Sequence, residues 1–301
     1  MKVSDMDPSN AGGDRCRDAF CSMLRPRVFK RAKVSDKAPR RGVGEHGEQG
    51  RRESDSDRRR MKISGLLGRA FARLRRSLWL SLGTDPVTKF PIRRRSDLVQ
   101  LGGKGGSWSV PGQLLGPSSV VYCVGCGEDI SFDLALIERF GCTVHAFDPT
   151  PRAIAYVERV AGKNAKYQFQ PIGLWSERKT MRFFAPRDPQ HVSHSVVNMQ
   201  GTEEYFEAPV ERLRDLQMSL EHSRIDLLKL DIEGAEYEVL RTLAEDSIFP
   251  RVLCVEFDEF FHPLDGEWRS RIIENVQRLR RLGYELVFTP GNANYTFVHA
   301  Q

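Results

Sequence analysis

Short apolar runs alternate with amphipathic stretches along the chain from residue 119 onward. Runs of strand length lie at 120–124, 143–147, 167–172, 225–230 and 252–257. The stretches between them place apolar residues at helical spacing, over 132–140, 151–161, 235–244 and 268–282. Two last runs, at 284–288 and 295–299, are separated by a short loop. The pattern predicts a doubly wound, mostly parallel seven-stranded α/β sheet of the Rossmann-like type, closed by a C-terminal antiparallel edge hairpin.

The alternation of strands and helices breaks between residues 173 and 222. Short apolar runs at 181–184 and 208–210 predict two short strands around a long polar loop, residues 185–206. Structured loops of this length in a compact domain are often functional. We therefore expect this loop to lie over the sheet edge and to help bind a substrate.

The first hundred residues differ in charge from the rest of the chain. They carry 25 Lys and Arg against 12 Asp and Glu, whereas residues 101–301 carry 21 against 28, so the net charge of +6 conceals a basic and an acidic part. Residues 1–60 are polar and show no apolar period, which predicts a disordered basic tail. No aromatic residue interrupts the arginine clusters at 51–52 and 58–60, so we do not expect nucleic acid as a partner.

Residues 61–80 form the first stretch with an apolar period. Leu67, Phe71, Leu74 and Leu78 share one helical face, and arginines occupy the other faces, which predicts a basic amphipathic helix. Such a helix can dock on the domain, the reading we favour, or make a weak contact with an anionic membrane surface. Because the composition changes at Met61, we expect residues 1–60 to contribute neither core contacts nor chemistry, either as a tail or because Met61 is the true first residue.

Residues 81–104 are expected to be a linker, and residues 105–301 one domain. No apolar run reaches the roughly 18 residues that a membrane span needs, and no apolar signal-peptide core is visible at the N-terminus. The spacing of the six cysteines matches no zinc pattern. These features favour a reducing, cytoplasmic setting, in a protein for which we expect no metal site.

Two glycines follow the first predicted strand of the domain, in the run Val124-Gly125-Cys126-Gly127-Glu128-Asp129. Glycines let a backbone approach a ligand closely, and the following helix N-terminus offers N–H groups. Asp148 ends the next predicted strand, where a carboxylate can accept both ribose hydroxyls of an adenosine. Ile130 stands where a dinucleotide fingerprint has its third glycine, which argues against NAD. The pair favours S-adenosylmethionine, a nucleoside cofactor without a pyrophosphate.

A charged run, residues 226–236, spans the fourth predicted strand and its turn. Strand alternation places Lys229 and Asp231 on one face, so that Asp231 lies at the carboxyl edge where open α/β sheets bind ligands. Glu256 ends the neighbouring strand and is expected beside Asp231. The three charges can form a buried ion-pair network, and the same network can orient a substrate hydroxyl or the sulfonium.

Residues 228–236 resemble the signature of the FkbM family of methyltransferases, and residues 125–133 and 147–151 resemble its cofactor loop and second-strand end. The resemblance covers about residues 105–300. It implies a class I methyltransferase fold, S-adenosylmethionine as cofactor, and a hydroxyl acceptor on a sugar or natural product. Many class I enzymes carry an acidic residue where this chain has Cys123, so Glu128 or Asp129 is expected to face the methionine ammonium instead. Ile172 is also expected to contact the cofactor.

The function that these features favour is S-adenosylmethionine-dependent O-methylation of a hydroxyl on a carbohydrate or small metabolite. Asp231 and Glu256 are the candidate catalytic carboxylates, and His194 is the candidate base, with His191 and His262 as alternatives. A catalytically inactive methyltransferase fold that binds a ligand or partner is the second hypothesis. An NAD-dependent oxidoreductase is the third, and Ile130 disfavours it.

Overall fold

The computed structural model describes residues 86–291 and 293–300. The tail expected at 1–60 and the helix expected at 61–80 lie outside the described residues. Part of the expected linker is described, and it contains a short 3-10 helix, η1 (Pro86–Lys89), and a strand, β1 (Leu98–Leu101).

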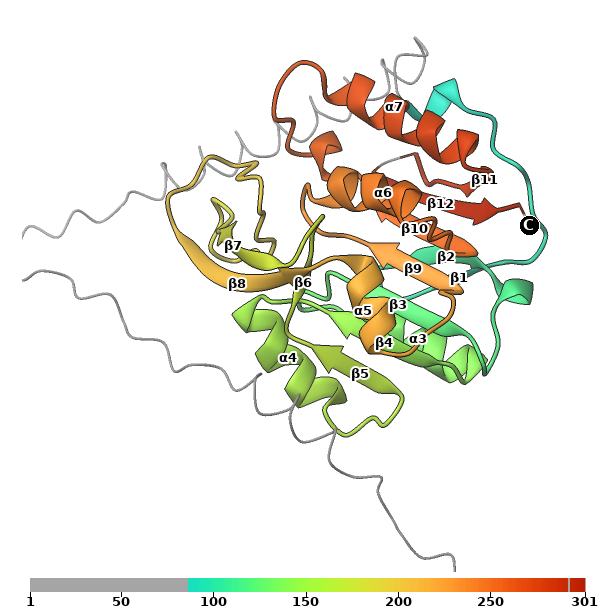
Figure 1. Cartoon of the computed structure of the whole chain (residues 1–301), viewed down its shortest axis with the longest axis horizontal. Coiled ribbons are helices and arrows are strands. Elements are labelled where there is room, and N and C mark those ends of the chain that lie inside the picture. Colours follow the sequence, from blue (N-terminus) through green and yellow to red (C-terminus); the bar gives the residue numbers. More distant parts are fainter. Residues whose placement is uncertain (1–85, 292, 301) are drawn as a thin grey trace, which may run out of the picture. The chain divides into compact units, whose positions relative to one another are not determined.

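The main sheet has seven strands in the order β11-β12-β10-β9-β3-β4-β5 (Figure 1). Their bounds are β3 (Val120–Val124), β4 (Thr143–Phe147), β5 (Tyr167–Gln170), β9 (Leu227–Leu230), β10 (Val252–Glu256), β11 (Tyr284–Phe288) and β12 (Asn294–His299). Neighbours from β5 to β10 are parallel, and β12 is antiparallel to both β10 and β11. The predicted doubly wound, mostly parallel sheet is confirmed. The second strand of the C-terminal hairpin, β12, inserts beside β10 and leaves β11 at the edge.

Helices cover both faces of this sheet, and strand alternation divides the core between them. The helices are α3 (Ser131–Phe140), α4 (Pro151–Ala161), α5 (Leu213–Ser219), α6 (Glu236–Glu245) and α7 (Trp268–Arg281). On β3, Val121 and Cys123 pack in a core with apolar residues of α3 and α4. Tyr122 and Val124 pack in the opposite core with α5, α6 and α7. The period-2 pattern of each strand therefore supplies both layers at once.

Helix α7 shows how the apolar pattern produces these elements. Its buried residues include Trp268, Ile272, Val276 and Leu279, which recur at three- and four-residue spacing on one face. Full burial of such side chains contributes roughly 1.5–3 kcal/mol each. The helix ends before Gly283, whose φ of 92° is a left-handed conformation that glycine adopts without strain.

A three-stranded sheet, in the order β6-β8-β7, is inserted between β5 and α5. Its strands are β6 (Gly173–Leu174), β7 (Lys179–Phe184) and β8 (Tyr205–Glu211). The short strands predicted at 181–184 and 208–210 are parts of β7 and β8. In Figure 1 this small sheet lies on the side to which the arrowheads of β4, β5 and β9 point. The insert therefore stands over the carboxyl edge of the main sheet.

The first described strand, β1, pairs antiparallel with β2 (Trp108–Pro111). Trp108 and Val110 are buried in the core that also contains α3 residues. We expected residues 81–104 to be a linker. Strand pairing instead begins at Leu98, because the alternating apolar residues of β1 complement those of β2.

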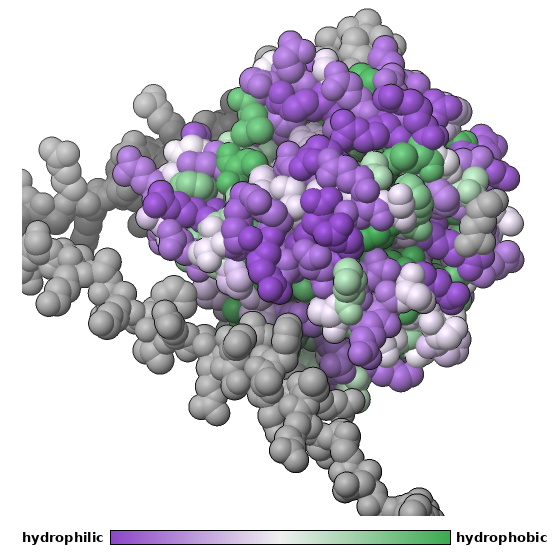
Figure 2. Space-filling view, viewed as in Figure 1, coloured by the Kyte–Doolittle hydropathy of each residue, from purple (hydrophilic) through white to green (hydrophobic). Residues whose placement is uncertain are grey.

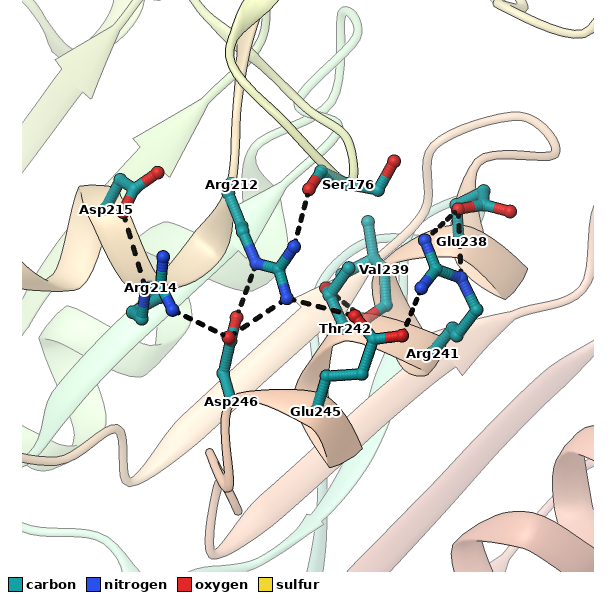
Figure 3. A network of polar contacts seen from close by, with 10 residues as sticks. All are labelled: Ser176, Arg212, Arg214, Asp215, Glu238, Val239, Arg241, Thr242, Glu245 and Asp246. Carbon is teal, nitrogen blue, oxygen red and sulfur yellow. Dashed lines mark hydrogen bonds and ion pairs between the residues drawn. The ribbon is translucent and has the colours of Figure 1, made fainter.

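An ion-pair network joins the insert to α6 (Figure 3). The guanidinium of Arg212 donates to the carbonyl of Ser176 at 2.9 Å, to Asp246 at 2.7 Å and to Glu245 at 3.0 Å. The Asp246 side chain is only 3% exposed, so this pairing is more than a surface contact. The network fixes the point at which the chain leaves the small sheet and enters α5.

The visible surface of the described part is mostly hydrophilic, with small apolar clusters (Figure 2). Within the described ranges, none of the helices combines the length and apolar character needed to cross a membrane.

Candidate functional site

A cavity of about 340 Å³ lies at the carboxyl edge of the main sheet. It is bounded by the loop after β3, the end of β4, the turn after β9 and part of the insert. Of the residues expected from the sequence to form the site, those lining it are Gly125, Gly127, Glu128, Asp129, Asp148, His194 and Asp231. Ile172 and Glu256 are not part of this lining. Ile172 packs against the sheet core, while the next two residues, Gly173 and Leu174, reach the cavity.

The glycine loop after β3 is packed directly on the turn after β9. Gly125 has a φ of +84°, and a Cβ at this position would lie 1.7 Å from the carbonyl oxygen of Asp231. Gly127 is also left-handed, with a φ of +53°. We expected Gly125 to allow the approach of a ligand. The structure shows that a glycine is needed here because the backbone of Asp231 packs directly against this position.

Asp148, at the end of β4, holds the glycine loop in place. Its Oδ2 accepts the N–H groups of Cys126 and Gly127, both at 2.9 Å, and its Oδ1 accepts the N–H of Thr150 at 2.8 Å. The residue is 5% exposed. A carboxylate offers about four acceptor positions. One therefore remains for a ligand hydroxyl, whereas the sequence predicted two such contacts.

The two acidic residues considered for the methionine ammonium differ in their partners. Glu128 accepts the guanidinium of Arg152 at 2.6 Å, so its charge is already paired. Asp129 accepts the N–H of Ser131, the first residue of α3, at 2.9 Å. No basic side chain is paired with Asp129 among the ion pairs of the described residues, which leaves it the better partner for a cationic ligand group.

Lys229 and Asp231 form the buried ion pair that strand alternation predicted. Lys229 Nζ lies 2.9 Å from Asp231 Oδ2 and donates to the carbonyl oxygen of Gly125 at 2.7 Å. Burial acts to lower the pKa of Lys229, but Asp231 and the buried Asp133 outweigh it and raise that pKa. Lys229 therefore stays charged beneath the glycine loop.

The turn after β9 is held in an unusual backbone conformation. Glu233 has a φ of +55°, and a left-handed non-glycine residue costs on the order of 1–3 kcal/mol. Glu236 is fully buried and accepts the N–H groups of Ile232 at 3.0 Å and of Gly234 at 3.1 Å. From the insert, Ser195 Oγ donates to the Glu233 carbonyl at 2.6 Å. These bonds offset the strain and keep the Glu233 side chain at the cavity.

Five carboxyl groups gather behind this turn, and we call them the acidic cluster: Asp231, Glu233, Glu236, Glu256 and Asp258. Burial, and then the neighbouring Asp231, raise the pKa of Glu256 to about 9. Burial, and then the other carboxylates, also raise the pKa of Asp258. Glu256 thus lies beside Asp231, as expected, but in the cluster and not in the cavity lining.

The sequence did not single out Asp258 or the cavity-lining Asp133. Asp133 is 3% exposed and accepts the Tyr167 hydroxyl at 3.0 Å. The one available signal was position. Asp258 follows the end of β10, and Asp231 directly follows the end of its parallel neighbour β9, so both acids belong to the same sheet edge.

His194 lies on the loop of the insert and faces two cavities. It lines the central cavity and also a second one, of about 630 Å³, next to it. Its Nδ1 donates to the Val192 carbonyl at 2.9 Å, and its ring packs edge-on against Phe206. This bond selects the Nδ1–H tautomer and leaves Nε2 as the basic nitrogen. Of the two alternatives, His191 lines only the second cavity and is largely exposed, and His262 lies outside both linings.

The central cavity suits a nucleoside that carries an amino acid. Its lining combines apolar side chains, among them Phe147, Leu174 and Phe183, with the carboxylates of Asp129 and Asp148. Apolar walls accommodate a purine ring, a buried carboxylate accepts a ribose hydroxyl, and an exposed one pairs with an ammonium group. The residues present therefore fit S-adenosylmethionine.

Comparison with known proteins agrees with this fit. The family model described as the methyltransferase FkbM domain matches residues 122–286. A 31-O-demethyl-FK506 methyltransferase, FkbM, from Streptomyces tacrolimicus is 28% identical over 202 residues, which are 58% of this chain and 75% of that protein. The probable methyltransferase-like protein 24 of Rattus norvegicus is 29% identical over 47% of this chain, and the match spans a third (33%) of that longer protein.

Among solved structures, fibrillarin from Aeropyrum pernix, in complex with natively bound S-adenosyl-L-methionine, overlaps 69% of this chain and 84% of its own. The identity is 9% and the TM-score 0.35. The family model covers more than half of the chain and contains both the end of β3 and the turn after β9. The chain belongs to the FkbM family of methyltransferases, with S-adenosylmethionine as its cofactor.

Proposed function

We propose that this methyltransferase transfers its methyl group to a hydroxyl of a carbohydrate or another small polar metabolite. The observation that carries the proposal is the position of His194 between the two cavities, with its Nε2 as the basic nitrogen. A hydroxyl is weakly acidic, so its transfer benefits from a positioned base, which contributes typically 10²–10⁴-fold.

The second cavity is the proposed acceptor site. Its lining is rich in charged and aromatic groups and includes Arg152, Arg187, His191, Glu204 and Tyr205. Tyr205 is 44% exposed, and aromatic faces beside polar groups are suited to sugar rings. The relative from Streptomyces tacrolimicus is named as the methyltransferase of a 31-O-demethyl compound, which supports an oxygen acceptor.

Each part of the site has a defined task in this reaction. Bound S-adenosylmethionine supplies an electrophilic methyl group. The glycine loop, Asp129 and Asp148 hold the cofactor, while Asp231 lies at the sheet edge and orients the groups that meet there. His194 takes the proton of the acceptor hydroxyl. Positioning of the two reactants accounts for most of the acceleration in such a displacement.

The test is a transfer assay with S-adenosylmethionine labelled in its methyl group. The purified chain is incubated with a panel of mono- and oligosaccharides, glycosylated metabolites and, as comparison, amines and thiols. We expect label on a hydroxyl oxygen, located by mass spectrometry and NMR. Transfer confined to nitrogen or sulfur would overturn the proposal, and so would tight binding of S-adenosylhomocysteine without turnover of any acceptor, the behaviour of an inactive binding protein.

A further inference from the structure

We propose that Asp231, Glu233 and Asp258 form a binding site for a hard divalent cation such as Mg²⁺, Ca²⁺ or Mn²⁺. One carboxylate oxygen of each lies within 4.8 Å of the other two. Two oxygens on one ion can be separated by at most twice the metal–oxygen distance, roughly 4.2 Å for Mg²⁺ and roughly 4.6–5.2 Å for Ca²⁺. The three oxygens thus lie close to the span of one Ca²⁺ ion, and small side-chain rotations bring them onto a common Ca²⁺ or Mg²⁺ ion.

The second observation is an oxygen without a partner. Asp258 is 4% exposed, and its Oδ2 finds no hydrogen-bond donor in the part of the chain that the structure describes. Burying a carboxylate oxygen in this way is costly unless a charge or donor meets it. The oxygen belongs to the group that shares the site with Asp231 and Glu233, so a cation there would satisfy it.

The side chains around Asp258 are of the kind that a hard cation prefers as ligands. The main electrostatic effects on Asp258 come from Glu233, Glu236, Glu256 and Asp231, all of them carboxyl groups. Lys229 is the ammonium that pairs with Asp231, and it is shared with Asp133 of α3.

The site is open on one side. Asp231 and Glu233 line the central cavity, and the Asp231 side chain is 29% exposed, so an ion can enter from there. Ions of this class keep several oxygen ligands besides the protein's carboxylates. One of the remaining coordination positions of the ion could take an oxygen of the acceptor. This role in catalysis rests on the proposed function, whereas metal binding itself does not.

The test is calorimetric titration of the full chain, stripped with EDTA, with Mg²⁺, Ca²⁺ and Mn²⁺ in separate runs. We expect one ion per chain for at least one metal, and at least tenfold weaker binding in Asp258→Asn. The matched control is Asp215→Asn, which neutralises a surface carboxylate of α5 paired with Arg214, and it should bind as the parent chain does. Absence of binding at millimolar concentrations of all three metals would overturn the proposal, as would undiminished binding by Asp258→Asn.

Two further measurements keep the result interpretable. If Asp258→Asn does not fold, Glu233→Gln takes its place. It removes a second ligand, at the cavity, and should weaken metal binding by a similar factor. EDTA should lower the melting temperature of the parent chain but not that of the variants. Titration with S-adenosylhomocysteine on the same samples separates the two proposals, because a chain that binds this ligand and transfers methyl groups but binds no metal refutes only the cation site.

Discussion

The ammonium of Lys229 lies 2.9 Å from the carboxylate of Asp231, and both side chains project from the same face at the end of β9. Lys229 also donates to the carbonyl of Gly125, so one buried cation connects the cofactor loop with the turn that bears Asp231. The pair gives the carboxyl edge of the sheet its fixed geometry.

Lys229→Met should destabilise the fold by about 3 kcal/mol, because it leaves a partly buried carboxylate uncompensated beside the acidic cluster. The measurement is urea unfolding at pH 7. Lys179→Met is the matched control, since Lys179 pairs with Glu177 on the surface and its loss should cost about 1 kcal/mol or less. Equal effects of the two substitutions would contradict the structural importance of the Lys229–Asp231 pair.

Gly125→Ala should abolish or strongly weaken cofactor binding. The added Cβ would lie 1.7 Å from the Asp231 carbonyl oxygen, and the φ of +84° is itself unfavourable for alanine. We expect at least a tenfold rise in the Kd for S-adenosylhomocysteine and a lower melting temperature. Gly116→Ala is the control, because its Cβ would meet no atom within 4 Å. If Gly125→Ala bound S-adenosylhomocysteine as the parent chain does, the contact between the glycine loop and the turn after β9 would not be needed for cofactor binding.

His194→Asn should lower the single-turnover rate of methyl transfer by roughly 10²–10⁴-fold while leaving the affinity for S-adenosylhomocysteine nearly unchanged. The Nε2 lone pair is lost, whereas the asparagine amide takes the place of Nδ1 and can still donate to the Val192 carbonyl. His262→Asn is the control, because His262 lies outside the linings of both cavities and should be dispensable for activity. Equal losses in the two variants would contradict the assignment of His194 as the base.

His145 should make the protein less stable in weak acid. Burial, assisted by the neighbouring His222, lowers the pKa of His145 from its ordinary 6.5 to about 4. Between these two values the unfolded chain takes up a proton that the folded chain resists, so stability falls as the pH drops from about 6.5 toward 4.

His145→Gln removes this contribution. The difference in unfolding free energy between the parent chain and the variant should shift by about 1 kcal/mol, in favour of the variant, from pH 7.5 to pH 5; this figure is reduced for solvent screening. Paired thermal melts at the two pH values measure the shift. A difference that stays constant with pH would contradict the assignment.

The main sheet could be predicted from the sequence because its strands are short, nearly continuous apolar runs between glycines and helices. Predicted strands at 120–124, 143–147 and 284–288 have the bounds of β3, β4 and β11. The sequence pattern does not predict helix α5, because this helix has seven residues and only two buried apolar positions, Leu213 and Leu216. A segment that short carries too little periodic signal.

The site was readable in part, for a different reason. Residues next to strand ends, such as Asp148 and Asp231, follow from topology, because parallel strands end at one edge. Contacts between segments distant in sequence do not. The three N–H groups on Asp148, the unpartnered Oδ2 of Asp258 and the bond that orients His194 each depend on loop conformations that no local pattern encodes.

The insert that contains β6, β7 and β8 leaves the main sheet after β5 and returns before α5, as one uninterrupted piece of chain. It provides His194 and most of the second cavity, while the glycine loop and the carboxylates come from the sheet. Evolution could therefore retarget such an enzyme by exchanging a single segment. The exchange would have to preserve the close fit of Val197 and Met199 on Gly234, where an added Cβ would lie 2.5 Å from the valine. A replacement insert would therefore need small or well-placed side chains at this contact, so that the turn after β9 keeps its conformation.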